Sequence, residues 1–462
     1  MGFRLRQIEK GSKFIQHLTM DALCQVVPND VVLAVLEAEG LKTKRERKLN
    51  LMVMVYVVIG MGLFPTLRIG NVMNKLAKGL RYIWEDPDIA IPGDSALSYR
   101  RDQLGARPIV ELFRRICRPI ATPETPGAFL FGLRGMAIDG TTEDVADSPE
   151  NAAVYGRHSN GRGDAAYPQI QGVYLVECGT RAIVDAGFWP CHTSERIGGF
   201  RMLRSLTEGM LVMWDRGFHD FNMIVEARKH NAHVLARLPA HVQPKRIKTL
   251  RDGSYLAYLY PSDYHKKKRG DHCLVRIIEY TITHPDIPGY GETHRLVTTL
   301  LDPVLYPGLE LACAYHERWE IELVIDEIDT HQRLSGRPLR SKTPVRVIQE
   351  LYGLLIAHFI VRFLMHQAAI AHSLDPDRLS FSHALELIRD AVDQFQQTVK
   401  EQLDSLHQRL LRDIAAKRLP KSRLRSNPRV VKRKMSNFQR KRPENRFVTI
   451  PLDSFAQAVA LI

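Results

Sequence analysis

Apolar residues recur at three- and four-residue steps through the first quarter of the chain. This spacing predicts helices over residues 31–39, 49–63, 67–84, 95–104 and 108–117. The most apolar run, residues 51–64, ends before Pro65 and is too short to span a bilayer, which requires about 20 apolar residues. We therefore expect a buried helix within a helical N-terminal domain over residues 1–125, with neither a membrane span nor a secretory signal.

A Pro-rich linker at residues 121–127 precedes a change of pattern. Short runs of β-branched and apolar residues then predict strands over 135–139, 169–177, 181–188, 211–215 and 232–238. Helical spacing predicts helices over 194–208 and 218–229. The order strand, hairpin, helix, strand, helix, strand is typical of a mixed α/β core, and we assign its first part to residues 126–238.

The α/β pattern is then interrupted. Residues 239–310 alternate strand-like and turn-like pieces, and we expect a β-rich insertion there. Helical spacing returns over residues 310–330 and 344–372. We assign residues 311–372 to the second part of the same core.

The C-terminal region, residues 373–462, combines an amphipathic helix with a basic tail. The helix, over about residues 382–414, either packs on its own domain or mediates dimerisation. Residues 417–446 contain 13 Lys or Arg and one acid, so they carry +12 of the formal net charge of +14. Without a lipid signal or a membrane span, such a segment favours a nucleic-acid partner. The alternative is a solvated tail that binds nothing.

The six cysteines are dispersed and none forms a C-x-x-C pair, so neither a disulfide framework nor a zinc ribbon is predicted. Cys191-His192 and His272-Cys273 are adjacent pairs without zinc-finger spacing, and we expect no structural zinc site. This cysteine usage fits a reducing cytoplasm. The Gly-rich basic stretch 156–163 lacks the ending of a P-loop, so it is either a DNA-facing loop or a surface loop without a ligand.

Three carboxylates stand out by their placement. Asp139 and Asp215 each end a predicted strand, where α/β sheets present ligand-binding groups. Glu322 lies on the helix predicted over residues 310–330. Two divalent cations about 3.5–4 Å apart stabilise the attacking and leaving oxygens of phosphodiester hydrolysis, and three carboxylates can hold such a pair. Oxygen ligands favour Mg²⁺ or Mn²⁺. Ordinary Asp-Gly turns are the alternative for each Asp taken alone.

The predicted helix that carries Glu322 has two faces. Residues at three- and four-residue steps share one side of a helix. The side chains expected on one polar stripe are Tyr315, Arg318, Glu322, Asp326 and Asp329, and those expected on the opposing apolar stripe are Ile321, Ile325 and Ile328.

These residues occur in recognisable motifs. Asp139 stands in Ile-Asp-Gly-Thr and Asp215 in Asp-Arg-Gly-Phe. Tyr315, Arg318 and Glu322 match a Y-x2-R-x3-E signature. On these motifs the chain resembles the IS4 family of bacterial insertion-sequence transposases along nearly its whole length. The resemblance implies an RNase H-like catalytic domain, a β-rich insertion and a DDE triad of Asp139, Asp215 and Glu322 that binds Mg²⁺ or Mn²⁺.

One position departs from the family pattern. The signature continues with a Lys where this chain has Asp329. In the family that Lys is associated with phosphate contact, whereas an acid within about 4 Å would repel a phosphate by roughly 1–4 kcal/mol. Either Arg333 substitutes for the Lys or the activity is impaired. We expect Arg333 and His331 on other faces of the helix than Asp329.

The resemblance implies a DNA transposase, of the cut-and-paste kind. Hydrolysis at the end of the transferred strand would free a 3′-OH, which then attacks a second phosphodiester, across the duplex as a hairpin or in target DNA. The implied partners are double-stranded DNA, as terminal inverted repeats and target, and a second copy of the chain in a synaptic homodimer. The expected location is the bacterial cytoplasm, at the nucleoid. A metal-dependent DNA nuclease and a catalytically impaired DNA-binding relic are the alternatives.

Several side chains are candidate DNA contacts. The resemblance implies phosphate contact by Arg318 and a hydrogen bond from Tyr315 to the DNA backbone. Trp319 either stacks on an unpaired base or packs in the core. Arg100 and Arg101 lie on a predicted helix that either reads DNA or exposes a solvated face. The other cationic candidates are Arg216, Arg425, Lys432, Arg433, Lys434, Arg440, Lys441 and Arg442.

Overall fold

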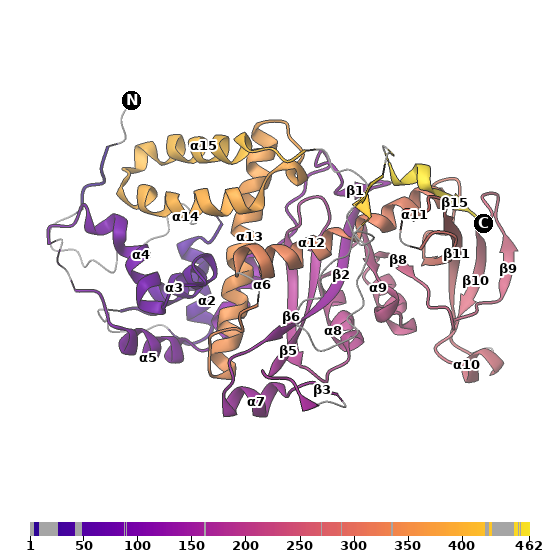
Figure 1. Cartoon of the computed structure of the whole chain (residues 1–462), viewed down its shortest axis with the longest axis horizontal. Coiled ribbons are helices and arrows are strands. Elements are labelled where there is room, and N and C mark those ends of the chain that lie inside the picture. Colours follow the sequence, from indigo (N-terminus) through magenta and orange to yellow (C-terminus); the bar gives the residue numbers. More distant parts are fainter. Residues whose placement is uncertain are drawn as a thin grey trace. The chain divides into compact units, whose positions relative to one another are not determined.

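The computed structural model describes residues 4–8, 26–41, 49–86, 88, 90–160, 163–268, 270–287, 289–333, 336–420, 425–426, 448–450, 452 and 454–462. Contacts between residues divide the chain into two compact units, and Figure 1 labels most of their helices and many of their strands. Unit 1 comprises residues 1–128, 139–205 and 320–419, and unit 2 comprises residues 129–138, 206–319 and 420–462. Each unit is thus assembled from segments that are far apart in the sequence.

The helices at the start of unit 1 follow the predicted pattern closely. α3 is buried almost throughout, because apolar residues occupy all of its faces. The side chain of Asn50 caps this helix by accepting from the Val53 N–H at 2.8 Å. The helices are α2 (Asn29–Ala38), α3 (Leu51–Leu63), α4 (Ile69–Arg81), α5 (Asp94–Leu104) and α6 (Arg107–Ile116).

α13 (Pro344–Ala371) is the central core helix of unit 1. It is long and apolar enough to cross a membrane, but 78% of its most apolar window is buried inside the protein. Its packing against α3 depends on two glycines. A Cβ at Gly62 would lie 2.6 Å from the Gly353 carbonyl oxygen, and a Cβ at Gly353 would lie 2.6 Å from that of Val58. The backbones of α3 and α13 therefore pack in direct contact.

Two helices replace the single helix expected over residues 382–414. They are α14 (Phe381–Gln397) and α15 (Lys400–Ala416). The chain is extended at Val399, whose N–H donates to the carbonyl oxygen of Arg4 at 3.0 Å. The apolar periodicity continues through the break, which is why the pattern indicated one helix. Both helices bury their apolar faces within unit 1, in agreement with packing on their own domain.

Unit 1 also contains the hairpin predicted from β-branched residues. β5 (Gln169–Glu177) pairs antiparallel with β6 (Ile183–Pro190), and α8 (Glu195–Met202) packs against both strands. The helix expected over residues 194–208 thus ends earlier, and a 3₁₀ turn continues it. The remaining short elements of unit 1 are α7 (Pro149–Tyr155), β3 (Ser159–Asn160), β4 (Gly163–Asp164), η2 (Leu203–Ser205) and η5 (Pro376–Arg378).

Unit 2 is built on a mixed sheet with the hydrogen-bonded order β2-β7-β8-β12-β11-β10-β9. Residues 133–138 of β2 (Leu133–Asp144) belong to this unit and pair in parallel with β7 (Met210–Trp214), which pairs in parallel with β8 (His233–Arg237). The expected β-rich insertion extends this sheet from β8 with antiparallel strands, so it does not form a separate sheet. These strands are β12 (Thr293–Thr298), β11 (Cys273–Ile282), β10 (Tyr255–Leu259) and β9 (Arg246–Thr249).

The prediction of a mixed α/β fold with a large mixed sheet is confirmed. In unit 2, α9 corresponds to the helix predicted between β7 and β8, and several shorter elements accompany it. These elements are α9 (Phe221–Lys229), α10 (Asp263–Lys268), β1 (Phe129–Leu130), β13 (Arg425–Ser426), β14 (Val448–Thr449), β15 (Val459–Leu461), η3 (Arg216–Phe218) and η7 (Phe455–Ala458).

The helix expected over residues 310–330 is divided. α11 (Gly308–Glu317) belongs to unit 2, whereas α12 (Glu320–Asp326) and the π-helical turn η4 (Glu327–Gln332) belong to unit 1. The prediction of one continuous polar stripe is therefore wrong, because it extrapolated the helical period across a break.

Candidate active site

Asp139 and Asp215 each follow a paired residue of two parallel strands directly. Ile138 of β2 is the register partner of Trp214 of β7. Ile138 and Trp214 are fully buried, whereas the two Asp side chains are half-buried. The buried apolar run of β7 ends at Asp215, as the sequence predicted. The prediction that Asp139 ends its strand is wrong, because β2 continues to Asp144, and Asp139 lies within β2 directly after the last residue that pairs with β7.

Both Asp carboxylates accept a hydrogen bond from the local backbone. Asp139 Oδ1 accepts from the Gly140 N–H at 2.8 Å, and Asp215 Oδ1 accepts from the Gly217 N–H at 2.6 Å. A Cβ at Gly140 would lie 3.3 Å from the Gly172 carbonyl oxygen, so the chain is closely packed just after Asp139. These bonds hold the direction of each carboxylate, that of Asp139 within β2 and that of Asp215 just after β7.

Tyr315 lies inside unit 2 and holds the end of β7. Its hydroxyl donates to the Trp214 carbonyl oxygen at 3.3 Å, and its side chain is buried. Burial raises the pKa of this hydroxyl, and the nearby Asp215 carboxylate adds to the increase. The expected hydrogen bond from Tyr315 to the DNA backbone is therefore wrong, because the hydroxyl is buried and donates within the protein.

Arg318 and Trp319 differ in exposure. Arg318 is buried, and its guanidinium carbon lies 5.8 Å from the centroid of the Tyr315 ring. Trp319 is 49% exposed, which excludes the interpretation that it packs in the core. Arg216, next to Asp215, is exposed as well. Unit 2 thus presents two side chains to solvent, the Trp319 ring next to Arg318 and the Arg216 guanidinium next to Asp215.

Glu322 lies in the first turn of α12 and is half-buried. The start of this helix is tied to the β5–β6 hairpin, because Glu320 Oε2 accepts from the Gly179 N–H at 2.7 Å. Glu322 therefore belongs to unit 1, whereas Tyr315 and Arg318 of the same signature belong to unit 2.

Asp329 lies in a cluster with Glu143 and Arg333. Arg333 Nη1 donates to Glu143 Oε2 and also, at 3.3 Å, to Asp329 Oδ1. Burial and the neighbouring Glu143 carboxylate raise the pKa of Asp329 to about 8. Asp329 is thus mostly protonated at neutral pH and does not act there as a bare negative charge. The prediction that Arg333 lies on another face is wrong, because residues four apart share a helix side.

Arg100 and Arg101 of α5 are each only 6% exposed. Arg100 Nε donates to the Leu49 carbonyl oxygen at 2.8 Å, and Arg101 Nε donates to Gln349 Oε1 at 2.8 Å. The prediction that these arginines contact DNA is therefore wrong. Burial lowers the pKa of Arg101 to about 10, so its guanidinium remains charged at neutral pH inside unit 1.

Most of the basic tail lies outside the described residues. Arg425 belongs to the short strand β13, and nothing more of its side chain is described. A role of this tail in DNA binding stays a prediction. The candidate residues outside the described part of the chain are Lys432, Arg433, Lys434, Arg440, Lys441 and Arg442.

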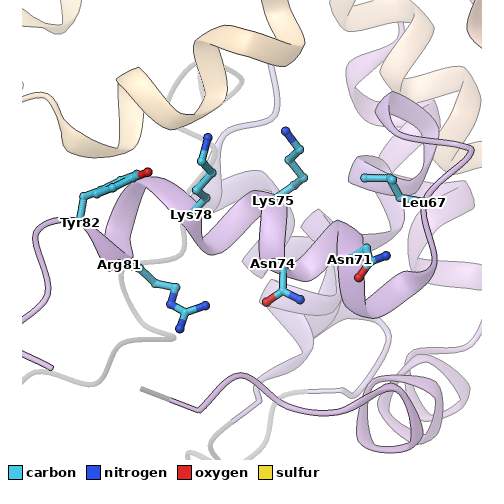
Figure 2. A pocket seen from close by; sticks show the side chains of 7 residues that line it. All are labelled: Leu67, Asn71, Asn74, Lys75, Lys78, Arg81 and Tyr82. Atoms are coloured by element: carbon cyan, nitrogen blue, oxygen red, sulfur yellow. The ribbon is translucent and has the colours of Figure 1, made fainter. Parts of the chain in front are cut away.

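α4 borders a polar groove in unit 1 (Figure 2). Lys75 and Lys78 project from one side of the helix, whereas Asn74 and Arg81 project from the other. Lys78 forms an ion pair with Asp393 at 2.7 Å. The sequence analysis missed this groove, because its few charges are a small part of the basic excess beside those of the tail. The polar residues of α4, which recur at helical spacing, are the signal that could have indicated it. The groove has a volume of about 810 Å³ and is lined by Leu67, Asn71, Asn74, Lys75, Lys78, Arg81 and Tyr82.

The three acids fit a hard divalent cation. Asp139, Asp215 and Glu322 offer oxygen ligands, which Mg²⁺ and Mn²⁺ prefer. All three side chains are half-buried, so their carboxylates are neither sealed in the core nor fully hydrated.

Two family descriptions match the sequence. Residues 17–114 match the family described as insertion element 4 transposase N-terminal, and residues 130–360, half of the chain, match the family described as transposase DDE domain. Transposases with a DDE domain generally use divalent metal ions.

A relative with a similar sequence gives the same assignment. The chain is 29% identical over 420 residues to transposase InsG for insertion sequence element IS4 of Escherichia coli (strain K12), covering 87% of this chain and 90% of InsG. It is 25% identical over 147 residues to the putative transposase InsZ of that organism, covering 32% of this chain and 49% of InsZ. A cryo-EM structure of the piggyBac transposase synaptic complex with hairpin DNA is similar at 11% identity and a TM-score of 0.43, covering 89% of this chain and 88% of that one. The chain belongs to the IS4 family of insertion-sequence transposases and carries the DDE domain of these enzymes.

Proposed function

We propose that this transposase acts by cut-and-paste and that Asp139, Asp215 and Glu322 hold Mg²⁺, with Mn²⁺ as the alternative ion. The assignment of the metal ligands rests on the register of two strands. Ile138 and Trp214 are partners in a parallel pair, and neighbouring strands lie about 4.8 Å apart. The next residues, Asp139 within β2 and Asp215 just after β7, therefore start from adjacent positions where the pairing of the two strands ends.

The side chains of the protein would position the reacting groups. The bound cations would stabilise charge on the oxygens of the scissile phosphodiester. The N–H groups of Gly140 and Gly217 orient the two Asp carboxylates. Tyr315 positions the end of β7 from within the core. Trp319 offers an exposed ring on which an unpaired base at the cleaved end would stack.

We also propose that double-stranded DNA, as terminal inverted repeats and as target, contacts the groove along α4. Its lysines suit phosphate oxygens, and its asparagines suit both phosphates and base edges. Lys78 is engaged with Asp393, so Lys75 is the better candidate for a phosphate contact. Joining two transposon ends would require a homodimer, acting at the nucleoid in the bacterial cytoplasm.

A strand-transfer assay with a pre-cut terminal end, in Mg²⁺, tests the catalytic proposal. Asp215→Asn and Glu322→Gln should each abolish joined products while they retain DNA binding. Asp220→Asn is a matched control, because Asp220 also accepts a local N–H, that of Asn222 at 2.7 Å, and lies in the same loop. Joining by Asp215→Asn at the rate of the unchanged protein would refute the proposal.

The same assay separates the alternatives. A nuclease would cut the terminal end without joining it to target DNA. An impaired relic would bind DNA and form neither product. Inverted repeats and a target duplication flanking the gene would independently support transposition.

A further inference from the structure

A group of nitrogen and sulfur ligands in unit 1 differs in chemistry from the three acids. His158, Cys191 and His192 each bring a possible ligand atom within 4.8 Å of the other two. Cys191 is buried, whereas both His side chains are exposed. We propose that these three residues bind Zn²⁺. The sequence pattern had argued against a zinc site, because it considered only ligands that are close along the chain.

The arrangement requires only a small closure to bind the ion. Zn–N bonds of about 2.0–2.1 Å and Zn–S bonds of about 2.3 Å place tetrahedral ligands roughly 3.3–3.6 Å apart. The rings of His158 and His192 lie edge to face, with centroids 5.6 Å apart. Because both rings are exposed, rotation of their side chains brings the nitrogens toward the fixed sulfur of Cys191.

The backbone around these residues is tied together. Cys191 N–H donates to the Tyr155 carbonyl oxygen at 2.9 Å, at the end of α7. Ala165 N–H donates to the His158 carbonyl oxygen at 2.8 Å. The two segments that carry the ligands are therefore held close together before any ion binds, which lowers the cost of ordering the site.

Arg157 holds the His158 segment from the other side. Its Nη1 donates to the carbonyl oxygens of Ala165 at 3.1 Å and Ala166 at 2.6 Å. Its Nη2 lies 2.6 Å from Asp147 Oδ1 in an ion pair. These bonds fix the ends of the loop in which His158 stands.

Gly156 keeps space open between the ligands. It ends α7 with a φ of +75°, which a residue with a side chain adopts only with strain. A Cβ at this position would lie 3.4 Å from His192 Nε2 and 3.5 Å from Cys191 Sγ. A side chain at this position would therefore lie in van der Waals contact with both of these ligand atoms.

The ligand set selects the kind of ion. Imidazole and thiolate favour Zn²⁺, whereas Mg²⁺ prefers oxygen ligands. On binding, the Cys191 thiol would lose its proton to solvent, and water would complete a tetrahedron. The ion would join the turn after β6 to His158, which follows the end of α7.

Titration of the full-length protein with Co²⁺, followed by displacement with Zn²⁺, tests the site. The titration is repeated with Asp215→Asn, which lacks one of the carboxylates proposed to hold the catalytic ions. We expect one Co²⁺ with a thiolate-to-cobalt charge-transfer band, which Cys191→Ser abolishes. His158→Asn and His192→Asn should each weaken Zn²⁺ affinity at least about 100-fold, because loss of an outer partner alone costs 10–100-fold. His272→Asn is the matched control, since His272 also adjoins a cysteine but belongs to no such group among the described residues.

Two results would overturn the proposal. One is the absence of a thiolate band in the unchanged protein, and the other is a Zn²⁺ affinity of His192→Asn equal to that of His272→Asn. Thermal unfolding provides a second measurement, because a ligand of the folded state raises Tm. Zn²⁺ should raise Tm in the unchanged protein and not in His192→Asn, which replaces an exposed side chain.

Discussion

The hydroxyl of Tyr315 donates a hydrogen bond to the carbonyl oxygen of Trp214 at 3.3 Å, one residue before Asp215. Both side chains are buried in unit 2. Because burial raises the pKa of Tyr315, the hydroxyl keeps its proton over the whole physiological range. We therefore propose that the signature tyrosine positions Asp215 through the backbone of β7.

Tyr315→Phe should remove this hydrogen bond and preserve the ring. The free energy of unfolding should fall by about 1 kcal/mol, the usual contribution of one hydrogen bond. Strand transfer per bound complex should slow about tenfold, which corresponds to about 1.4 kcal/mol, because Asp215 is held less firmly, while DNA affinity stays unchanged. Tyr290→Phe, at an exposed tyrosine of the same unit, is the control. A loss of DNA affinity with an unchanged transfer rate would instead show contact with DNA.

Trp319→Ala should weaken binding to a cleaved end that carries unpaired bases, with little effect on stability. Stacking of one base is worth about 1–3 kcal/mol, so we expect a loss of roughly 5- to 150-fold. Trp319→Phe should retain most of the affinity. Leu323→Ala serves as the control, because Leu323 is 47% exposed and Trp319 is 49% exposed. A large fall in Tm for Trp319→Ala, measured by thermal unfolding, would contradict a surface role.

The sequence pattern was sufficient to predict helices and strands where the local signals agree with the burial of the side chains. Apolar periodicity located α3, and the β-branched runs located the β5–β6 hairpin. Asp215 could be placed at a strand end for the same reason, whereas the strand that contains Asp139 continues to Asp144 through polar residues that the apolar pattern did not include. The break between α11 and α12 could not be predicted, because the apolar period continues through it. The ligand group of His158 and Cys191 could not be predicted either, since only the tertiary fold joins positions so distant in sequence.

Buried arginines show a further limit. Arg101 looks like a surface residue in the sequence, yet it donates to Gln349 Oε1 at 2.8 Å and to Ser341 Oγ at 3.1 Å. We expect Arg101→Gln to lower the free energy of unfolding by about 1–3 kcal/mol, because buried partners lose their hydrogen bonds. Urea unfolding measures this loss. A change in the salt dependence of DNA binding without a change in stability would show that Arg101 contacts DNA after all.

Lys75→Ala should weaken DNA binding with little effect on stability, in contrast to Arg101→Gln, which should lower stability. The side chain is exposed on α4, so stability should change by less than about 0.5 kcal/mol. If Lys75 contacts a phosphate, the slope of log affinity against log salt should become shallower by about one. Binding measured at several salt concentrations gives this slope. Lys400→Ala, at an exposed lysine of α15, removes the same charge and controls for a general change of surface charge, and an equal effect there would count against a specific contact.

Asp329 makes stability depend on pH. Its pKa is raised from 3.8 to about 8 by burial and by Glu143. Between these values the folded protein binds one more proton than the unfolded chain, so stability falls as pH rises through this window. Asp329→Asn resembles the protonated acid and should remove this contribution. The variant should therefore gain stability over the unchanged protein as pH rises toward 8, measured by urea unfolding at several pH values.

The same protonation determines whether Asp329 obstructs DNA. Below about pH 7 the acid is mostly neutral, so Asp329→Asn should transfer strands at the rate of the unchanged protein. Above its pKa of about 8, the ionised acid would repel phosphate despite Arg333, and the variant should become the faster enzyme. Asp326→Asn, at an exposed acid one turn earlier, should show no such divergence with pH. A constant rate ratio between Asp329→Asn and the unchanged protein from pH 6 to 9 would mean that this acid does not face DNA, and that the lysine of the family signature has no functional counterpart at this position.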